Sequence, residues 1–260
     1  MKLLNINYSD YSGGSAIACS RLHNAFLRNN VNSWLAVCQS NKKNKNVLTF
    51  SKNKNLIKYL IKKNFLRVFL KYYEKKLNTD FSLSLFDNPL FNEININNFD
   101  LINLHWIGNE TLSLNQISKI EKPVIWTLTD MWPFLGGEHI NYKNLIGSNY
   151  WNDEKTLYKS KANINKINLK RKIKYYDNQI QPVAISKWLS DIASQSIIFK
   201  GKDIKVIPCT LDFDYWRPKE NLQFKKKICD GNKKVILFSS SAGTKDLKKG
   251  FNYLTNALSK

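Results

Sequence analysis

The chain has 260 residues, of which 43% are hydrophobic and 13% aromatic, so it carries enough apolar side chain for a folded core and is not a disordered polymer. Its formal net charge is +21, which attracts nucleic acid, anionic membranes or phosphorylated substrates, unless the lysines only solvate the surface. No nucleic-acid-binding motif accompanies the charge, so we expect no nucleic-acid partner.

The beginning of the chain predicts a β-α-β unit. Residues 2–7 alternate as in a strand and lead into Gly13-Gly14. A helical pattern follows, with four apolar side chains on one face, Ala18, Leu22, Ala25 and Phe26. Residues 33–37 predict the second strand. This unit is the building block of a doubly wound parallel sheet.

Strands and helices continue to alternate along the chain. A helix without Gly or Pro is predicted for residues 55–77. Later strands are expected at residues 100–105, 124–129, 181–185, 205–208 and 235–239. A final helix is expected to start near Lys249. We therefore predict an α/β fold with a first domain over 1–216, a charged link over 217–234 and the start of a second domain over 235–260.

Two loops at predicted strand ends carry candidate ligand-binding residues. At Gly13-Gly14, missing side chains let a ligand approach the backbone N–H groups of a helix start, although a plain tight turn is the alternative. Residues 126–140 read WTLTDMWPFLGGEHI, a loop with aromatic rings, glycines and the carboxylate of Asp130. Such a composition suits sugar binding at the carboxyl ends of strands. The alternative is a core-packing loop in which Asp130 caps a helix.

This loop resembles the signature of a bacterial branch of glycosyltransferase family 4, which reads Thr-Leu-His-Asp-Met-Trp-Pro-Phe-Thr-Gly-Gly-Cys-His-Tyr. Other stretches resemble that family in the same order over nearly the whole chain. They are Gly13-Gly14 with Arg21-Leu22-His23, Asn103-Leu104-His105-Trp106-Ile107, Ala184-Ile185-Ser186-Lys187-Trp188-Leu189, Val206-Ile207-Pro208 and Lys248-Lys249-Gly250-Phe251.

The resemblance implies a GT-B architecture, in which two Rossmann-like domains face each other across a cleft. It implies retaining transfer from a nucleotide-diphosphate sugar, which is a co-substrate, with no further cofactor and no essential metal. The acceptor would be a saccharide, for example an undecaprenyl-linked one, in the synthesis of a surface polysaccharide such as lipopolysaccharide. The implied substrate-binding residues are Gly13, Gly14, Ser15, Trp106, Trp132, Gly136, Gly137, Ser186, Lys249 and Gly250. Of these, Lys249 would face the diphosphate.

The catalytic candidates are Thr129, Asp130, His105 and His139. Thr129 stands where the family has histidine. Unlike histidine, threonine neither takes up nor releases a proton near neutral pH. His105 and His139 are possible replacement bases, or histidines with structural hydrogen bonds. Glu138 replaces a cysteine, so no metal is expected. The family's Glu-x7-Glu element would fall beyond the last residue, so the alternative is a truncated, inactive or split-half enzyme that binds acceptor or a partner chain without turnover.

The predicted helix over residues 55–77 is rich in both lysines and apolar residues. It places Leu56, Ile57, Leu60, Ile61 and Phe65 as neighbours on the helical wheel. Such a helix can lie on an anionic membrane surface, or it can be a core helix whose lysines face the solvent. The four cysteines form no C-x-x-C pair, and the first residues do not resemble a signal peptide. We expect a cytoplasmic protein, which the membrane alternative for residues 55–77 would make peripheral on the inner face of the cell membrane.

Overall fold

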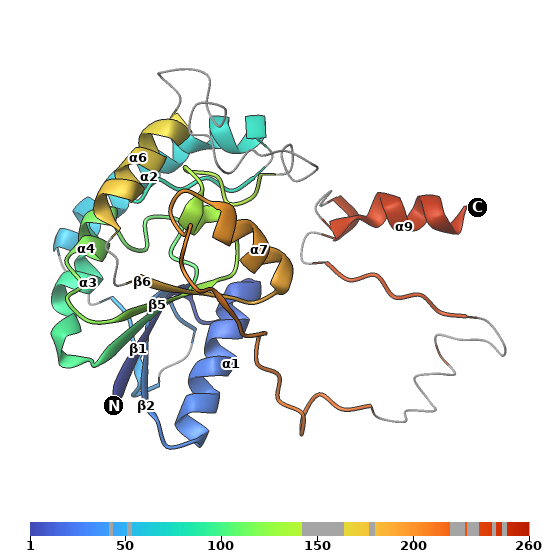
Figure 1. Cartoon of the computed structure of the whole chain (residues 1–260), viewed down its shortest axis with the longest axis horizontal. Coiled ribbons are helices and arrows are strands. Elements are labelled where there is room, and N and C mark those ends of the chain that lie inside the picture. Colours follow the sequence, from blue (N-terminus) through green and yellow to red (C-terminus); the bar gives the residue numbers. More distant parts are fainter. Residues whose placement is uncertain are drawn as a thin grey trace. The chain divides into compact units, whose positions relative to one another are not determined.

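The computed structural model describes residues 1–41, 44–50, 54–77, 79–141, 164–176, 180–218, 227, 234–240, 243–245 and 249–259 (Figure 1). The chain divides into two compact units, Met1–Thr210 and Leu211–Lys260. The first unit contains all of the sheet. None of the helices in the described part of the chain is long and apolar enough to cross a bilayer.

The first unit is built on a seven-stranded sheet in the order β3-β2-β1-β4-β5-β6-β7. The strands are β1 (Lys2–Ser9), β2 (Asn32–Gln39), β3 (Val47–Leu48), β4 (Leu101–Leu104), β5 (Val124–Leu128), β6 (Ile180–Ala184) and β7 (Lys205–Val206). Every neighbouring pair is parallel. The order runs outward in both directions from β1 and β4, and ligands of such sheets bind outside the carboxyl ends of the strands at this switch.

Helices cover both faces of this sheet. In Figure 1, α1 lies on one side, and α3 and α4 lie on the other. The helices are α1 (Gly14–Arg28), α2 (Lys54–Leu77), α3 (Pro89–Glu93), α4 (Leu114–Ser118), α6 (Ile164–Tyr175), α7 (Lys187–Gln195) and, in the second unit, α9 (Phe251–Leu258). Local caps fix several starts, because the side chains of Asn88, Ser113 and Ser186 accept hydrogen bonds from the first-turn N–H groups of α3, α4 and α7.

Alternate residues of the central strands point to opposite faces, and the two faces differ. One face carries the apolar core, which includes the fully buried Ile102, Leu104, Trp126 and Leu128. The other face, on the α1 side, carries a chain of polar side chains. Thr127 Oγ1 donates to Asn103 Oδ1 at 2.9 Å, Asn103 Nδ2 donates to Asn5 Oδ1 at 3.2 Å, and Asn5 Nδ2 donates to Ser33 Oγ at 3.0 Å. Burial of amides is tolerated here because each finds a partner.

The predicted α/β fold with a parallel, Rossmann-like sheet is confirmed, as is the helix predicted for residues 55–77. The strand predicted for residues 235–239 is wrong, because residues 234–240 form no regular structure. A strand requires a neighbour for its hydrogen bonds, and the described residues of the second unit provide none. Most of the predicted link over 217–234 lies outside the described residues. In the first helix Ala16, Cys19 and His23 are buried, whereas the residues of the predicted face, Ala18, Leu22, Ala25 and Phe26, are half-buried.

Candidate functional site

The glycine turn after β1 leaves the start of α1 open. Gly13 has φ 92°, a backbone conformation that favours glycine. A Cβ built on Gly13 or Gly14 would meet no atom of the chain within 4 Å outside its immediate neighbours. Within the described stretch 1–41, no side chain caps α1 and no acidic residue stands in its first turn. The helix start therefore presents free N–H groups and the positive end of its dipole to solvent.

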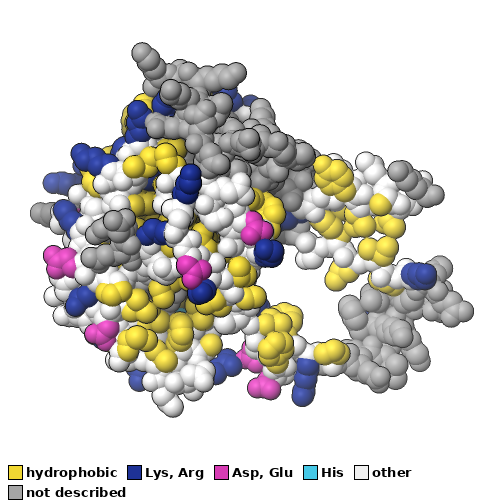
Figure 2. All heavy atoms as spheres, viewed as in Figure 1, with side chains coloured by type: hydrophobic (Ala, Val, Ile, Leu, Met, Phe, Trp, Pro, Cys, Tyr) yellow, Lys and Arg dark blue, Asp and Glu magenta, His cyan; other side chains and the backbone are white. Residues whose placement is uncertain are grey.

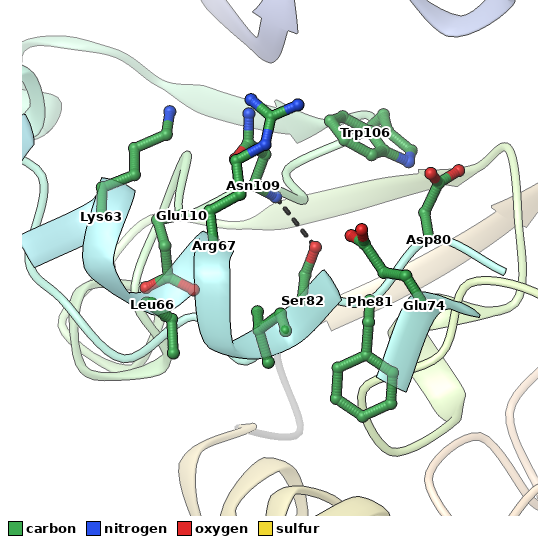
Figure 3. A pocket seen from close by; sticks show the side chains of 11 residues that line it. Lys63, Leu66, Arg67, Glu74, Asp80, Phe81, Ser82, Trp106, Asn109 and Glu110 are labelled. Carbon is green, nitrogen blue, oxygen red and sulfur yellow. Dashed lines mark hydrogen bonds between the residues drawn. The ribbon is translucent and has the colours of Figure 1, made fainter. Parts of the chain in front are cut away.

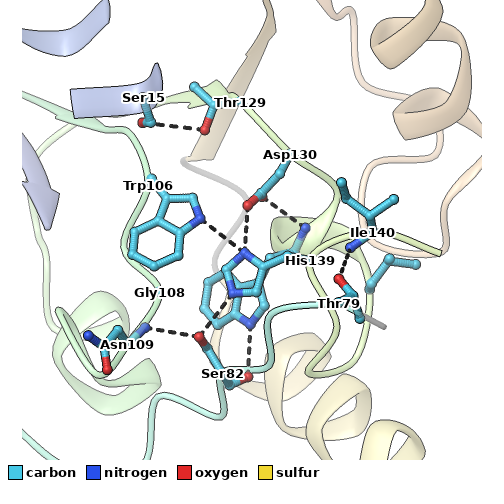
Figure 4. A network of polar contacts seen from close by, with 12 residues as sticks. Ser15, Thr79, Ser82, Trp106, Gly108, Asn109, Thr129, Asp130, His139 and Ile140 are labelled. Carbon is cyan, nitrogen blue, oxygen red and sulfur yellow. Dashed lines mark hydrogen bonds and ion pairs between the residues drawn. The ribbon is translucent and has the colours of Figure 1, made fainter. Parts of the chain in front are cut away.

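Two hydroxyl groups meet beside this turn. Ser15 Oγ lies 3.5 Å from Thr129 Oγ1, which follows the end of β5 (Figure 4). Asn7 of β1 holds Ser15 and Trp106 in place. Its Oδ1 accepts from Ser15 Oγ at 3.1 Å and from the backbone N–H of Trp106 at 2.9 Å. The carboxyl ends of β1, β4 and β5 thus bring Ser15, Trp106 and Thr129 to one edge of the sheet.

A carboxylate, an imidazole and a hydroxyl form a chain next to these residues. Asp130 Oδ2 lies 2.5 Å from Nδ1 of His139, and His139 Nε2 lies 2.9 Å from Ser82 Oγ (Figure 4). The Asp130 carboxylate can only accept a hydrogen bond, so the Nδ1–H of His139 donates to it and Nε2 accepts from the Ser82 hydroxyl. Trp106 Nε1 lies 3.0 Å from the same Nδ1. His139 is 3% exposed, so its ring is held inside the protein by partners at both nitrogens.

Trp132 lies underneath this chain in the core. It is 1% exposed and its ring stacks with that of His139, with an interplanar angle of 20° and centroids 6.0 Å apart. Its Nε1 donates to the carbonyl oxygen of Ser82 at 2.9 Å. Because the ring is fully buried, no sugar can stack on it in this structure. Trp106 is the aromatic residue of the site that is half-buried and borders a cavity.

A buried lysine from α6 holds the loop of residues 130–135. Lys172 is fully buried, donates to the carbonyl oxygens of Trp132 and Leu135, and has its Nζ 3.6 Å from the centroid of the Trp132 ring. Burial lowers the pKa of Lys172 well below its ordinary value, while the nearby Asp130 and Glu138 oppose that shift. Asn168 Nδ2 also donates to the carbonyl oxygen of Gly136 at 2.9 Å.

Close packing accounts for both glycines of this loop. A Cβ at Gly136 would lie 2.5 Å from the carbonyl oxygen of Asn165, and a Cβ at Gly137 would lie 2.2 Å from Cε1 of Phe81. Both residues are buried. Their role here is to let α6 and the Phe81 segment approach the loop, and their backbone is not open to a ligand.

A polar cavity of about 120 Å³ adjoins Trp106 (Figure 3). Its charged and polar lining consists of Lys63, Arg67, Glu74, Asp80, Ser82, Asn109 and Glu110. The Glu110 carboxylate accepts hydrogen bonds from the backbone N–H groups of residues 84–86, at 2.7, 2.6 and 3.0 Å. Burial raises the pKa of Glu110 and lowers that of Lys63. The cavity presents ring, cation and carboxylate together, which suits a polyhydroxylated ligand.

His105 lies on the α1 side of the sheet, on the same face as Asn103. It is 3% exposed, and burial lowers its pKa to about 3, so the ring is neutral at physiological pH. Its Nε2 lies 3.0 Å from Asn103 Nδ2, while its Nδ1 has no hydrogen-bond partner among the described residues. The ring borders a mainly apolar cavity of about 310 Å³ between α1 and β4, β5 and β6. Ala18, Leu22 and Phe26 line this cavity from α1.

Three predicted site residues do not take part in these contacts: Ser186 of the first unit, and Lys249 and Gly250 of the second. Ser186 caps α7, and its Oγ accepts from the backbone N–H of Leu189 at 3.2 Å. Lys249 is exposed and Gly250, with φ 71°, precedes α9 in the second unit. No three His, Cys, Asp or Glu side chains of the described residues converge as metal ligands would.

Sequence reasoning missed Ser82, Asn109, Glu110 and Lys172. Ser82 and Asn109 come from irregular segments, so no periodic pattern marked them. Lys172 occurs in a lysine-rich helix, and each lysine of such a helix is expected to be solvated. The sequence signal that was available is the pair of glycines in the loop, which indicates that another segment approaches closely.

No protein-family model matches the chain, and no curated protein is significantly similar to it. The likeness to glycosyltransferases therefore rests on the sequence motifs alone.

Proposed function

We propose that the chain is the acceptor-side part of a GT-B glycosyltransferase. It would transfer a sugar, with retention, from a nucleotide-sugar to a saccharide acceptor, such as a lipid-linked one in surface polysaccharide synthesis. The observation that supports this most is the open start of α1 beside Thr129 and Asp130. An uncapped helix start attracts a diphosphate, and polar groups at a sheet edge orient sugar hydroxyls. The sequence motifs are the only support for membership of the family.

In the proposed reaction the protein contributes orientation and charge stabilisation. The first-turn N–H groups of α1, after Gly13 and Gly14, would stabilise the negative charge that develops on the leaving diphosphate. Trp106 would stack on the acceptor, and the Ser15 and Thr129 hydroxyls would bind hydroxyls of the transferred sugar. Asp130 would keep His139 and the loop in place.

Neither buried histidine is positioned as a general base. The Nδ1 of His139 is held by Asp130, its Nε2 by Ser82, and His105 is neutral inside the sheet. This favours a second candidate, in which the chain binds acceptor or a partner chain without turnover. The partner would then supply the rest of the donor site.

Saturation-transfer NMR with a panel of nucleotide-sugars tests the proposal. We expect signals from the diphosphate-proximal ribose and the sugar, and loss of these signals in Gly14→Leu, whose side chain fills the open space before α1. The matched control is Asn24→Leu, an exposed position on the same helix, which should bind as the parent does. Absence of binding by any nucleotide or nucleotide-sugar would reject a self-sufficient transferase. Binding without product formation on lipid-linked saccharides would favour the second candidate.

A further inference from the structure

Helix α2 has one face packed onto the first unit. The buried residues along it are Tyr59, Lys63, Leu66 and Leu70. Leu66 and Leu70 pack with Phe81 and Leu83 in a small apolar cluster. Lys63 lies over the ring of Tyr8, with its Nζ 4.8 Å from the centroid. Lys63 therefore belongs to the inner face and does not add to the surface charge.

The opposite, exposed face of α2 carries a row of apolar residues among its lysines. The apolar residues recur at three- and four-residue intervals, the spacing of one helical face. Their exposed fractions are 60% for Ile57, 65% for Ile61, 81% for Phe65, 70% for Val68, 50% for Phe69 and 65% for Tyr72. Scattered exposed apolar residues are ordinary, but a stripe of them over more than four turns of helix marks an interaction surface.

Lysines accompany this stripe. The exposed lysines of α2 are Lys58, Lys62, Lys71, Lys75 and Lys76. The one acidic residue of the helix, Glu74, lines the polar cavity on the inner side. In the view of Figure 2, Lys and Arg side chains lie among hydrophobic ones on the side of the molecule where α6 lies in front of α2 in Figure 1. The face therefore combines apolar side chains with positive charge and lacks a carboxylate of its own.

We infer that this face of α2 lies on an anionic lipid bilayer, with the helix axis in the plane of the membrane. The apolar stripe would enter the boundary between head groups and acyl chains. The lysine stems would run along the surface so that their ammonium groups meet lipid phosphates. A membrane explains both properties of the face, whereas a purely apolar protein groove would leave five ammonium groups without counter-charge. The inference does not depend on the proposed transfer activity.

Co-sedimentation with lipid vesicles tests the inference. The full chain should bind phosphatidylcholine vesicles that contain phosphatidylglycerol and should bind pure phosphatidylcholine much more weakly. The double variant Lys58→Glu/Lys71→Glu should bind the anionic vesicles more than about tenfold more weakly. The triple variant Ile61→Gln/Phe65→Gln/Val68→Gln should lose binding by a similar factor, although its charge is unchanged.

The matched control for charge is Lys119→Glu/Lys200→Glu, since both lysines are exposed and lie outside α2. Equal weakening in this control would reject α2 as the docking face and indicate attraction by total charge. Unchanged binding by the triple variant would also reject the inference. Sedimentation velocity without vesicles tests whether the chain self-associates through this face. If the chain self-associates through α2 and ignores the vesicles, the occupant of the face is a second copy.

Discussion

The carboxylate of Asp130 lies 2.5 Å from Nδ1 of His139, nine residues later in the chain. This contact closes the loop after β5 onto itself, and the Asp130 Oδ1 also accepts from the backbone N–H of Trp132 at 3.1 Å. The loop carries the half of the candidate site that faces the glycine turn. Its shape therefore depends on a charged hydrogen bond within the loop.

Replacement of Asp130 by alanine should lower the free energy of unfolding by about 2 kcal/mol, because two donors lose a charged acceptor. Urea unfolding followed by tryptophan fluorescence measures the change. The comparison variant is Asp191→Ala, which removes the exposed Lys187–Asp191 pair and should cost about 0.5 kcal/mol or less. Equal losses in the two variants would show that the Asp130–His139 contact has no special weight.

Gly137 and Gly14 should respond to alanine in opposite ways. Gly137→Ala should destabilise the protein by about 1–3 kcal/mol, since the new methyl group would overlap Phe81. Gly14→Ala should leave stability unchanged or raise it by about 0.5–1 kcal/mol, because the site is open and lies in the first turn of α1. Thermal unfolding of both variants measures this contrast. A stable Gly137→Ala variant would contradict the packing role of this glycine.

Lys172→Met should destabilise the chain by at least about 2 kcal/mol. The substitution keeps most of the side-chain volume but leaves the carbonyl oxygens of Trp132 and Leu135 without their donor. Lys174→Met, at an exposed position of the same helix, should change stability by no more than about 0.5 kcal/mol. Chemical unfolding of the two variants distinguishes a buried structural lysine from an ordinary surface lysine.

The sequence predicted six of the seven strands, all but the two-residue β3, because strand and helix patterns are local. Short apolar runs at β4, β5 and β6, separated by helical stretches, predict parallel strands, and Ser186 marks a helix start by its own side chain. The predicted strand at 235–239 failed for a non-local reason. An apolar run of this length becomes a strand only when a neighbouring strand supplies hydrogen bonds.

The candidate site was predictable only in part for the same reason. The positions of Gly13, Gly14, Thr129 and Asp130 follow from strand ends, which are local features. The burial of Trp132 does not, because an aromatic residue between glycines occurs both in ligand loops and in cores. The contact between Ser82 and His139 joins residues 57 apart. Only the folded chain brings such a pair together.

The buried, neutral His105 predicts a pH dependence of stability. Its pKa is about 3 in the folded protein, against an ordinary value of 6.5. Below pH 6.5 the unfolded chain binds a proton that the folded chain does not, so the free energy of unfolding falls as the pH decreases toward 3. Above pH 6.5 His105 contributes no slope. His23, whose pKa burial also lowers, adds a contribution of the same sign.

His105→Gln removes the titrating group and keeps a polar side chain of similar size. Between pH 6 and pH 4 its stability should fall less steeply than that of the parent, by up to one proton, or about 1.4 kcal/mol per pH unit. Urea unfolding at a series of pH values measures both slopes, and at pH 8 the two slopes should agree. The contribution of His23 cancels because it is present in both proteins. Identical slopes below pH 6 would mean that His105 takes up a proton in the folded state, which its place under α1 without a charged partner argues against.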